Sequence, residues 1–169
     1  MTLCPQLRRL QADHGRWLAG TARRAGETEA GHAARVLALW DAEILPHCRV
    51  EEEVLLPELA RRLSETDAVV LLTLADHVAL RRLVRELRCA GEGQRSASAD
   101  ALERKLTEHA AFEERTLFPA AQETLGCDRL AALAGELTKK SSAVSRRGRR
   151  CDGVTRTRRA RIRCRAPHP

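Results

Sequence analysis

The sequence predicts an all-α protein: an antiparallel up-down four-helix bundle, followed by a short extra C-terminal helix and a disordered basic tail. Apolar residues recur at intervals of three and four along four segments, which is the period of one helix face. Hydrophobic residues make up 43% of the 169 residues but aromatic residues only 2%, so the core consists mainly of Leu, Ala and Val. This composition favours helices over a sheet. The short connections between the four segments favour the up-down order.

The first helix is expected to begin at Pro5, because proline is favourable in a first helical turn, and to run to about Arg24. Two glycines, at positions 26 and 31, mark the connection that follows. Proline interrupts the second helix twice: Pro46 is expected to kink it, and Pro57 to bend or end it. The stripes of these two helices hold Leu3, Leu7, Leu10, His14, Trp17 and Leu18, and then Val36, Leu37, Trp40, Ile44, His47, Glu51, Val54 and Leu55.

The third helix is expected to follow a capping segment at residues 64–67 and to extend to about Cys89, where a Gly-Glu-Gly segment ends it. The fourth helix starts near Ser98 or Asp100. After Gly126, a shorter helix over residues 128–138 is expected to cover one end of the bundle. The stripes of the third and fourth helices hold Val70, Leu74, His77, Leu80, Arg81 and Val84, and then Leu102, Leu106, His109, Glu113 and Leu117.

Charge divides the chain into two parts. Residues 139–169 hold 12 Lys and Arg but one acid, a net charge of +11, whereas residues 1–138 hold 18 basic and 22 acidic residues, a net charge of −4. The tail has no apolar period and few large apolar side chains, so it is expected not to fold alone. The sequence therefore predicts one helical domain over residues 1–138 and a disordered basic tail over residues 139–169.

The chain is expected to be a cytoplasmic, monomeric protein. It has no apolar run of about 20 residues that could span a membrane, and charged residues interrupt any apolar segment near the N-terminus. The six cysteines show neither a Cys-x-x-Cys pair nor a regular spacing, so they favour neither a disulfide framework nor a zinc ribbon. Reduced thiols are the expectation that follows.

The chain also contains two similar halves. Residues 47–57 and 109–119 both read His-x3-Glu-Glu-x3-(Leu/Phe)-Pro and lie 62 positions apart. An Ala-Asp-His segment precedes each copy, at residues 12–14 and again at residues 75–77. Each half thus supplies one single histidine and one His-x3-Glu pair, and His and Glu four positions apart lie on the same helix face.

These residues interrupt the apolar stripes, so they are expected to point into the core. Two ionised carboxylates buried without partners would be very costly, and a pair of cations resolves the conflict. The predicted metal ligands are His14, His47, Glu51, His77, His109 and Glu113. A mixed nitrogen and oxygen set suits iron, with manganese or zinc as substitutes. Four imidazoles, two bridging carboxylates and one bridging oxide or hydroxide would leave two positions on a pair of six-coordinate metals for water or a small ligand.

The set His…His-x3-Glu…His…His-x3-Glu, with its flanking Glu-Glu-x3-(Leu/Phe)-Pro, resembles the hemerythrin-like (HHE cation-binding) family over roughly residues 3–138. The resemblance implies a four-helix bundle around a non-haem di-iron centre, with Glu51 and Glu113 bridging and two histidines on each iron. It also implies an oxo- or hydroxo-bridged iron pair. The chain departs from the oxygen-carrying branch, which has a fifth histidine where Glu113 stands here. This departure makes the set closer to bacterial members linked to nitrosative and oxidative stress, iron-centre repair or sensing.

Two functions remain open on the sequence. The first is binding or sensing of a small ligand (O2, NO or a reactive oxygen or nitrogen species) or of iron itself. The second is a stress-response di-iron enzyme that reduces NO or peroxide or repairs iron centres. The His-rich set, without the Glu-x-x-His pattern of the carboxylate oxidases, favours binding over catalysis.

Several other residues carry lesser expectations. Glu52, Glu53 and Glu114 are interpreted as solvated helix face, and Cys48 as buried packing rather than a ligand. His32 and His168 are expected to be exposed. The arginine clusters at residues 146–150 and 156–165 raise a hypothesis of weak nucleic-acid binding, although no aromatic residues are interleaved to stack on bases.

Overall fold

The computed structural model describes residues 2–150, and every regular element in this range is helical. The elements are α1 (Pro5–Thr21), α2 (Glu29–Leu39), η1 (Trp40–Ile44), α3 (Leu45–Val50), η2 (Glu51–Leu55), α4 (Leu56–Ala60), α5 (Ala68–Cys89), η3 (Glu92–Gln94), α6 (Arg95–Phe112), η4 (Glu113–Leu117) and α7 (Phe118–Arg150). Here η1, η2 and η4 are π-helical turns and η3 is a 3-10 turn.

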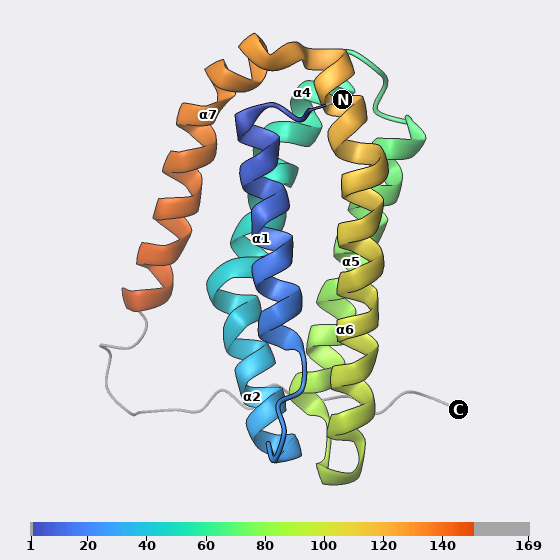
Figure 1. Ribbon diagram of the computed structural model, residues 1–169, viewed down its shortest axis with the longest axis vertical. Helices are drawn as coiled ribbons and strands as arrows, with labels where there is room; N and C mark the ends of the chain where they lie inside the picture. The colour runs from blue at the N-terminus through green and yellow to red at the C-terminus, as the bar shows by residue number, and fades with distance from the viewer. Residues whose placement is uncertain (1, 151–169) are drawn as a thin grey trace.

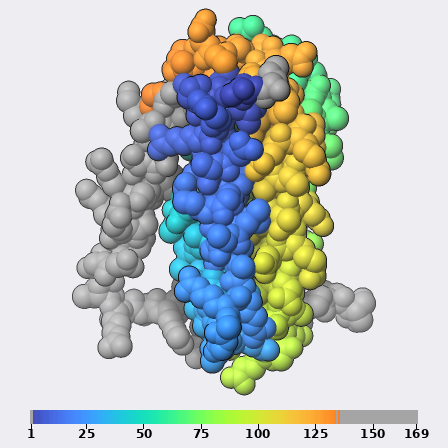
Figure 2. All heavy atoms as spheres, in the orientation of Figure 1, coloured from blue at the N-terminus to red at the C-terminus, as the bar shows by residue number. Residues whose placement is uncertain are grey.

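Long rods of helix lie side by side, and the connections between them alternate between the two ends of the bundle (Figure 1). The rods are α1, the run from α2 to α4, α5, and the run from α6 into the first part of α7. In the space-filling view, α1 and the rod that contains α6 meet along much of their length (Figure 2). The prediction of an all-helical bundle is therefore confirmed for the described residues.

Side chains cap the starts of α2 and α5, and the second of these lies in the capping segment that the sequence predicts. Thr28 Oγ1 accepts a hydrogen bond from the Gly31 amide at 3.1 Å, and Asp67 accepts one from the Val69 amide at 2.9 Å. These caps satisfy amides that the first turn of a helix leaves without partners. Gly26, with a φ of 74°, allows the sharp connection after α1, a conformation that an L side chain adopts only with strain.

The internal prolines do not end their helices. Pro46, Pro57 and Pro119 each lie six positions after the first residue of a π-helical turn, at Trp40, Glu51 and Glu113. A proline in a helix interior has no amide to donate, and its ring clashes with the carbonyl four residues earlier. The widened turn before each proline accommodates this conflict. Of the bend or end expected at Pro57, the end does not occur, because the helix continues to Ala60.

The core consists of two apolar clusters. One lies toward the α4 end of the bundle and contains Leu7, Leu55, Leu59, Leu117 and Phe118 among its members. The other lies toward the α2 end, and its buried members are Trp17, Ala33, Val36, Trp40, Ile44, Cys48, Leu80, Val84, Leu87, Ala99, Leu102 and Leu106. Along each helix the predicted ligands fall between these clusters, so a polar layer crosses the middle of the bundle.

The α7 helix changes direction at Gly126, where φ is 71°. The helical backbone then continues to Arg150, so the predicted boundary at Lys139 falls inside α7 and the first part of the predicted disordered tail is helical. Residues 151–169, which include His168 and the second arginine cluster, lie outside the described residues. Among the described helices, none combines the length and the apolar character needed to cross a membrane.

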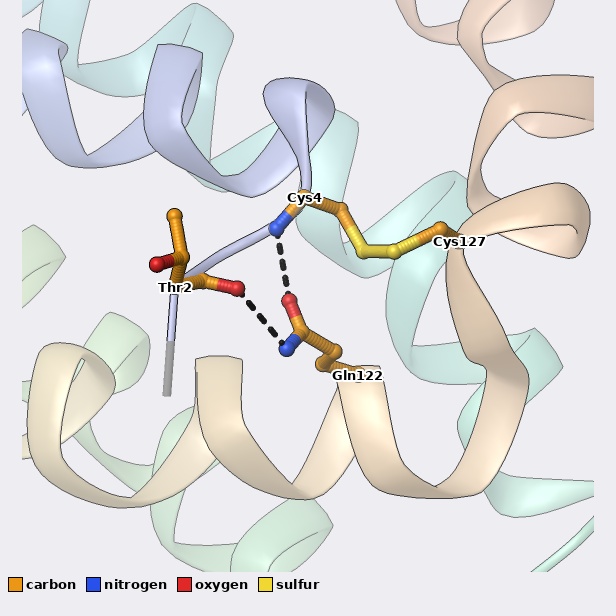
Figure 3. The surroundings of a disulfide bond; sticks show 4 residues. All are labelled: Thr2, Cys4, Gln122 and Cys127. Atoms are coloured by element: carbon orange, nitrogen blue, oxygen red, sulfur yellow. Dashed lines mark hydrogen bonds between the residues drawn. A yellow bond between two sulfur atoms is a disulfide. The ribbon is translucent and has the colours of Figure 1, made fainter.

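A disulfide joins Cys4 to Cys127, which corrects the expectation of reduced thiols for this pair. It fastens the segment before α1 to the bend at Gly126 (Figure 3). Gln122 supports the same junction, because its side chain accepts a hydrogen bond from the Cys4 amide at 2.6 Å and donates one to the Thr2 carbonyl at 3.2 Å. The sequence spacing did not reveal this pair, since the bend that brings Cys127 back to the N-terminus is a tertiary feature.

Candidate metal centre

The six predicted ligands come together in the polar layer between the two clusters. Each is buried: His47 is 4% exposed, His14 is 1% exposed, and the other four show no exposure. Ligand atoms of His14, His47 and Glu113 lie within 4.8 Å of one another. The same holds for ligand atoms of Glu51, His77, His109 and Glu113. The layer therefore contains two neighbouring ligand groups that share Glu113.

Glu51 extends between two histidines of different halves. Its Oε1 lies 3.1 Å from His47 Nε2, and its Oε2 lies 3.4 Å from His77 Nε2. The first contact joins positions i and i+4 of one helix, as the His-x3-Glu spacing predicts. Because the two oxygens face different imidazoles, one carboxylate reaches both ligand groups.

Glu113 extends between the groups in the same manner. Its Oε1 lies 3.1 Å from His109 Nε2 and 3.7 Å from His77 Nε2. Its Oε2 lies 3.0 Å from His14 Nε2 and 3.8 Å from His47 Nε2. This geometry pairs His14 with His47 on one side and His77 with His109 on the other, with a carboxylate oxygen from both glutamates directed to each side.

The inward atoms of this cluster make no hydrogen bonds. They are Nε2 of His14, His47, His77 and His109, and both side-chain oxygens of Glu51 and Glu113. Buried polar groups in folded proteins are normally paired, and unpaired buried carboxylates are especially costly. Imidazole nitrogens and carboxylate oxygens are ligands for iron, zinc and manganese, so the donor set fits a pair of such cations.

Both glutamates begin a π-helical turn. The Glu51 carbonyl accepts from the Leu56 amide, and the Glu113 carbonyl accepts from the Phe118 amide, five residues on in each case. A π turn contains one more residue than an α turn, so it re-aims the side chains that follow it. The Glu-x5-Pro spacing repeated in the two halves therefore places the same widened turn directly after each inward carboxylate.

The second glutamate of each Glu-Glu pair was interpreted as solvated face, and this interpretation is wrong for Glu52 and Glu114. Glu52 Oε1 lies 2.8 Å from His77 Nδ1, and Glu114 Oε1 lies 3.0 Å from His14 Nδ1. Both carboxylates are partly buried, at 23% and 34% exposed. Each contacts a histidine of the other half of the sequence.

The aspartates before His14 and His77 complete the pattern. Asp13 Oδ2 lies 3.2 Å from His47 Nδ1, and Asp76 Oδ2 lies 3.7 Å from His109 Nδ1. Each of the four histidines thus has a carboxylate near its outer nitrogen. Three of these contacts are within hydrogen-bond distance, and the contact between Asp76 and His109 is too long. Carboxylates in this position fix the ring orientation of metal-ligating histidines and raise their basicity.

Outer polar side chains hold these four carboxylates in turn. Arg81 lies 2.7 Å from Glu52, Lys105 lies 2.5 Å from Asp76, Arg16 pairs with Asp13, and the Gln11 amide donates to Glu114 at 3.0 Å. The sequence signal for the outer carboxylates was present: the repeats contain Asp-His and Glu-Glu, and not the predicted ligands alone.

In the metal-free cluster the imidazoles and carboxylates shift one another's titration. Burial lowers the pKa of His109, but the charge of Glu113 together with the neighbouring Asp76 and Cys48 outweighs burial and raises that pKa to about 9. Against burial, the surrounding carboxylates also raise the pKa of His47, and Cys48 and the surrounding carboxylates raise the pKa of His77. Burial raises the pKa of Glu113, but the imidazoles, led by His109, lower it well below its ordinary value. Protons and cations therefore compete for the same inward atoms.

Three other predictions from the sequence can be compared with the structure. Trp17 is fully buried, as expected, and its ring centroid lies 4.4 Å from that of His47 and 4.8 Å from that of His14. Cys48 is buried, also as expected. His32 is buried rather than exposed, because its ring nitrogen Nε2 lies 2.8 Å from the Thr21 carbonyl at the end of α1.

The comparison with protein families agrees with this geometry. A family model described as the hemerythrin HHE cation binding domain matches residues 3–121, a range that contains all six predicted ligands and all four outer carboxylates. No curated protein and no solved structure matches the chain. The match covers well over half of the chain and coincides with a buried His and Glu cluster that fits a metal site. The chain belongs to the hemerythrin HHE cation-binding domain family.

Proposed function

We propose that this chain is a non-haem di-iron protein that binds or senses a small ligand, either O2, NO, a related reactive species or iron itself. The observation that carries the proposal is the set of inward atoms without hydrogen-bond partners, four imidazole nitrogens and four carboxylate oxygens in one buried layer. The pairing of these atoms supports two metals rather than one, because each glutamate faces histidines on both sides.

In this proposal His14 and His47 hold one iron, and His77 and His109 hold the other. Glu51 and Glu113 would each supply one carboxylate oxygen to each of the two metals. When bound, the iron pair supplies a Lewis-acidic and redox-active centre for a small ligand. The nitrogen and oxygen donors of this set match iron better than a soft, thiolate-selective metal.

The remaining side chains of the layer hold the ligands in a binding-competent state. Glu52 and Asp13 have lowered pKa values despite burial, because histidine and arginine neighbours stabilise their ionised forms. An ionised carboxylate can only accept a hydrogen bond, so Nδ1 of His77 and His47 carries the proton. The lone pair of each Nε2 is then directed inward toward a metal.

A second candidate is turnover of the ligand by a stress-response enzyme that reduces NO or peroxide. The position of Trp17 favours it, since this oxidisable ring packs on His14 and His47 inside the core. The chain has no Tyr to share such a role. Binding remains our first proposal because the site is rich in imidazoles.

Anaerobic reconstitution with Fe(II) tests the proposal. Elemental analysis is expected to give two iron atoms per chain, and adding O2 or NO is expected to change the optical spectrum stoichiometrically. Repeated additions with a reductant separate the two candidates, because an enzyme consumes ligand continuously and a binding protein stops at saturation. One metal or fewer per folded chain under saturating iron would contradict the dinuclear site.

A further inference from the structure

Cys48 lies at one side of the metal layer, although its spacing from the other ligands gave no sign of it. Its side chain shows no exposure, and its thiol is free rather than disulfide-bonded. The Cys48 Sγ and ring nitrogens of His77 and His109 all lie within 4.8 Å of one another. This third group of metal-ligating residues shares His77 and His109 with the Glu51, His77, His109 and Glu113 group described above, and adds a sulfur to it.

The position of Cys48 follows from helix geometry. One residue along an α-helix turns the side-chain direction by about 100°. His47 faces His14 and Glu51, so the next residue on α3 faces past this pair, toward the helices that carry His77 and His109. Cys48 therefore belongs to the opposite side of the layer from its chain neighbour.

The histidines opposite Cys48 have unused donor atoms. His109 shows no exposure, and neither of its ring nitrogens makes a hydrogen bond. Nε2 of His77 also has no hydrogen-bond partner. Asp76, the outer carboxylate of His109, stands 3.7 Å away, so His109 is the least firmly held of the four histidines. Sulfur, two imidazoles and an oxygen from each glutamate thus surround one side of the layer.

We propose that Cys48 is a thiolate ligand of the metal held by His77 and His109. This inference rests on the proposed dinuclear site and deepens it. Thiolate sulfur binds iron and zinc at about 2.3 Å, and the thiol proton leaves for solvent as the bond forms. The metal at His77 and His109 then has one protein donor more than its neighbour. Consequently, a small exogenous ligand binds at the metal of His14 and His47, beside Trp17.

Cobalt(II) is the probe for this bond, because sulfur ligation gives a charge-transfer absorption in the near ultraviolet that nitrogen and oxygen ligands do not. The full chain loaded with Co(II) is expected to show this band, and Cys48→Ser and Cys48→Ala are expected to lose it. Ile44→Val is the matched control, a small change in the same buried cluster that is expected to keep the band. The double variant Cys4→Ser with Cys127→Ser is expected to keep it too, which excludes these sulfurs as its source.

X-ray absorption at the cobalt edge of the Co(II)-loaded wild-type chain gives a second measurement, which does not depend on whether a variant folds. A sulfur scatterer at about 2.3 Å from the metal supports the proposal. Two bound metals without a sulfur scatterer and without the band overturn the Cys48 assignment but leave the dinuclear site intact. Failure of the folded chain to bind any metal overturns both. A band that survives in Cys48→Ala with two metals bound also overturns the assignment.

Discussion

At the scale of single residues, the site consists of rows of linked side chains that run from the protein surface to the buried layer. An outer polar side chain holds a carboxylate, the carboxylate holds the outer nitrogen of a histidine, and the inner nitrogen faces the layer. Arg81, Glu52 and His77 form one such row, and Arg16, Asp13 and His47 form another. The inner atoms are therefore pre-oriented before a metal binds.

Replacing Glu51 or Glu113 by Ala is expected to remove both metals together, because each carboxylate faces both histidine pairs. His14→Ala or His77→Ala is expected to weaken mainly one metal. Elemental analysis of the purified variants measures the difference. A glutamate variant that keeps full metal content and an unchanged spectrum would show that the carboxylates do not bridge.

Glu52→Gln is expected to lower metal affinity by about 10- to 100-fold, because an amide holds the His77 ring less firmly and lowers its basicity. Glu65→Gln removes the same charge from an exposed position and serves as the control. Competition with a chelator of known affinity measures both variants. Equal affinities in the two would mean that the Glu52 contact has no role in metal binding.

The metal-free domain is expected to lose stability as the pH rises through about 9. His109 has a raised folded pKa, so its protonated form stabilises the fold fully below the ordinary value of 6.5, and this contribution disappears through about 9. Glu113 has the opposite pH dependence, because its folded pKa is lowered. Its ionised form stabilises the fold fully above the ordinary value of 4.5, and this contribution is lost only at a much lower pH.

Urea unfolding of chelator-treated protein across this range measures the effect. The metal-loaded protein is the comparison, because bound cations replace the protons at the same atoms. A metal-free protein whose unfolding midpoint stays constant from pH 6 to about 10 would contradict the assigned His109–Glu113 interaction.

At the scale of elements, the prolines explain why two of the four helical rods are not regular. A widened turn precedes each of Pro46, Pro57 and Pro119, and in the last two cases the turn starts at an inward glutamate. The position of the ligand and the irregularity of the helix thus share one sequence cause. A regular α-helix in the same place would direct the residues after the glutamate differently.

Pro119→Ala is expected to weaken metal binding while leaving the metal-free bundle as stable or more stable. Alanine is better in a helix interior by about 3 kcal/mol, and its amide lets an ordinary turn compete with the widened one. Metal competition and thermal unfolding monitored by circular dichroism check the two effects. Pro5→Ala, at the first turn of α1, is the control. Identical metal affinities in Pro119→Ala and Pro5→Ala would show that the widened turn does not contribute to metal binding.

At the scale of the whole molecule, the bundle and the basic end of the chain carry opposite charges. Residues 1–138 have a net charge of −4 and residues 139–169 have one of +11. No predicted ligand lies beyond Glu113, and the apolar clusters end at Leu133 in the described part of the chain. The metal centre and any nucleic-acid affinity therefore belong to different parts of the molecule.

Removal of residues 139–169 is expected to leave iron content and thermal stability unchanged. The same deletion is expected to abolish any binding to a DNA duplex, and the full chain is expected to bind it more weakly as salt rises, because counterions are released. Iron analysis and binding titrations at two salt concentrations check these results. A shortened chain that fails to fold would show that the folded domain extends beyond residue 138, into the last part of α7.

Sequence reasoning identified the six residues that meet in the buried layer, because His-x3-Glu occurs twice at helical spacing with the same flanking residues. It missed the outer role of Glu52, because a residue next to a ligand on one helix was not expected to reach a histidine on another. Leu74 was expected near the core, but it is 38% exposed and Thr73 is buried instead, since neighbouring positions on α5 differ by about 100°. The Cys4–Cys127 pair depends on the direction of the bend at Gly126: the glycine marks a break in the helix, but no local pattern encodes which way the chain turns there.

The Cys4–Cys127 bond has a topological consequence for the metal centre. Its two ends are 123 positions apart, and all six predicted ligands lie between them. The ligand-bearing chain is therefore one covalently closed ring, which restricts even the unfolded protein and stabilises the fold by up to about 5 kcal/mol in a chain-entropy description. Within such a ring the two His-x3-Glu segments stay closer together on average than in an open chain, so a chain that unfolds and releases its metals has less conformational entropy to lose when the site forms again.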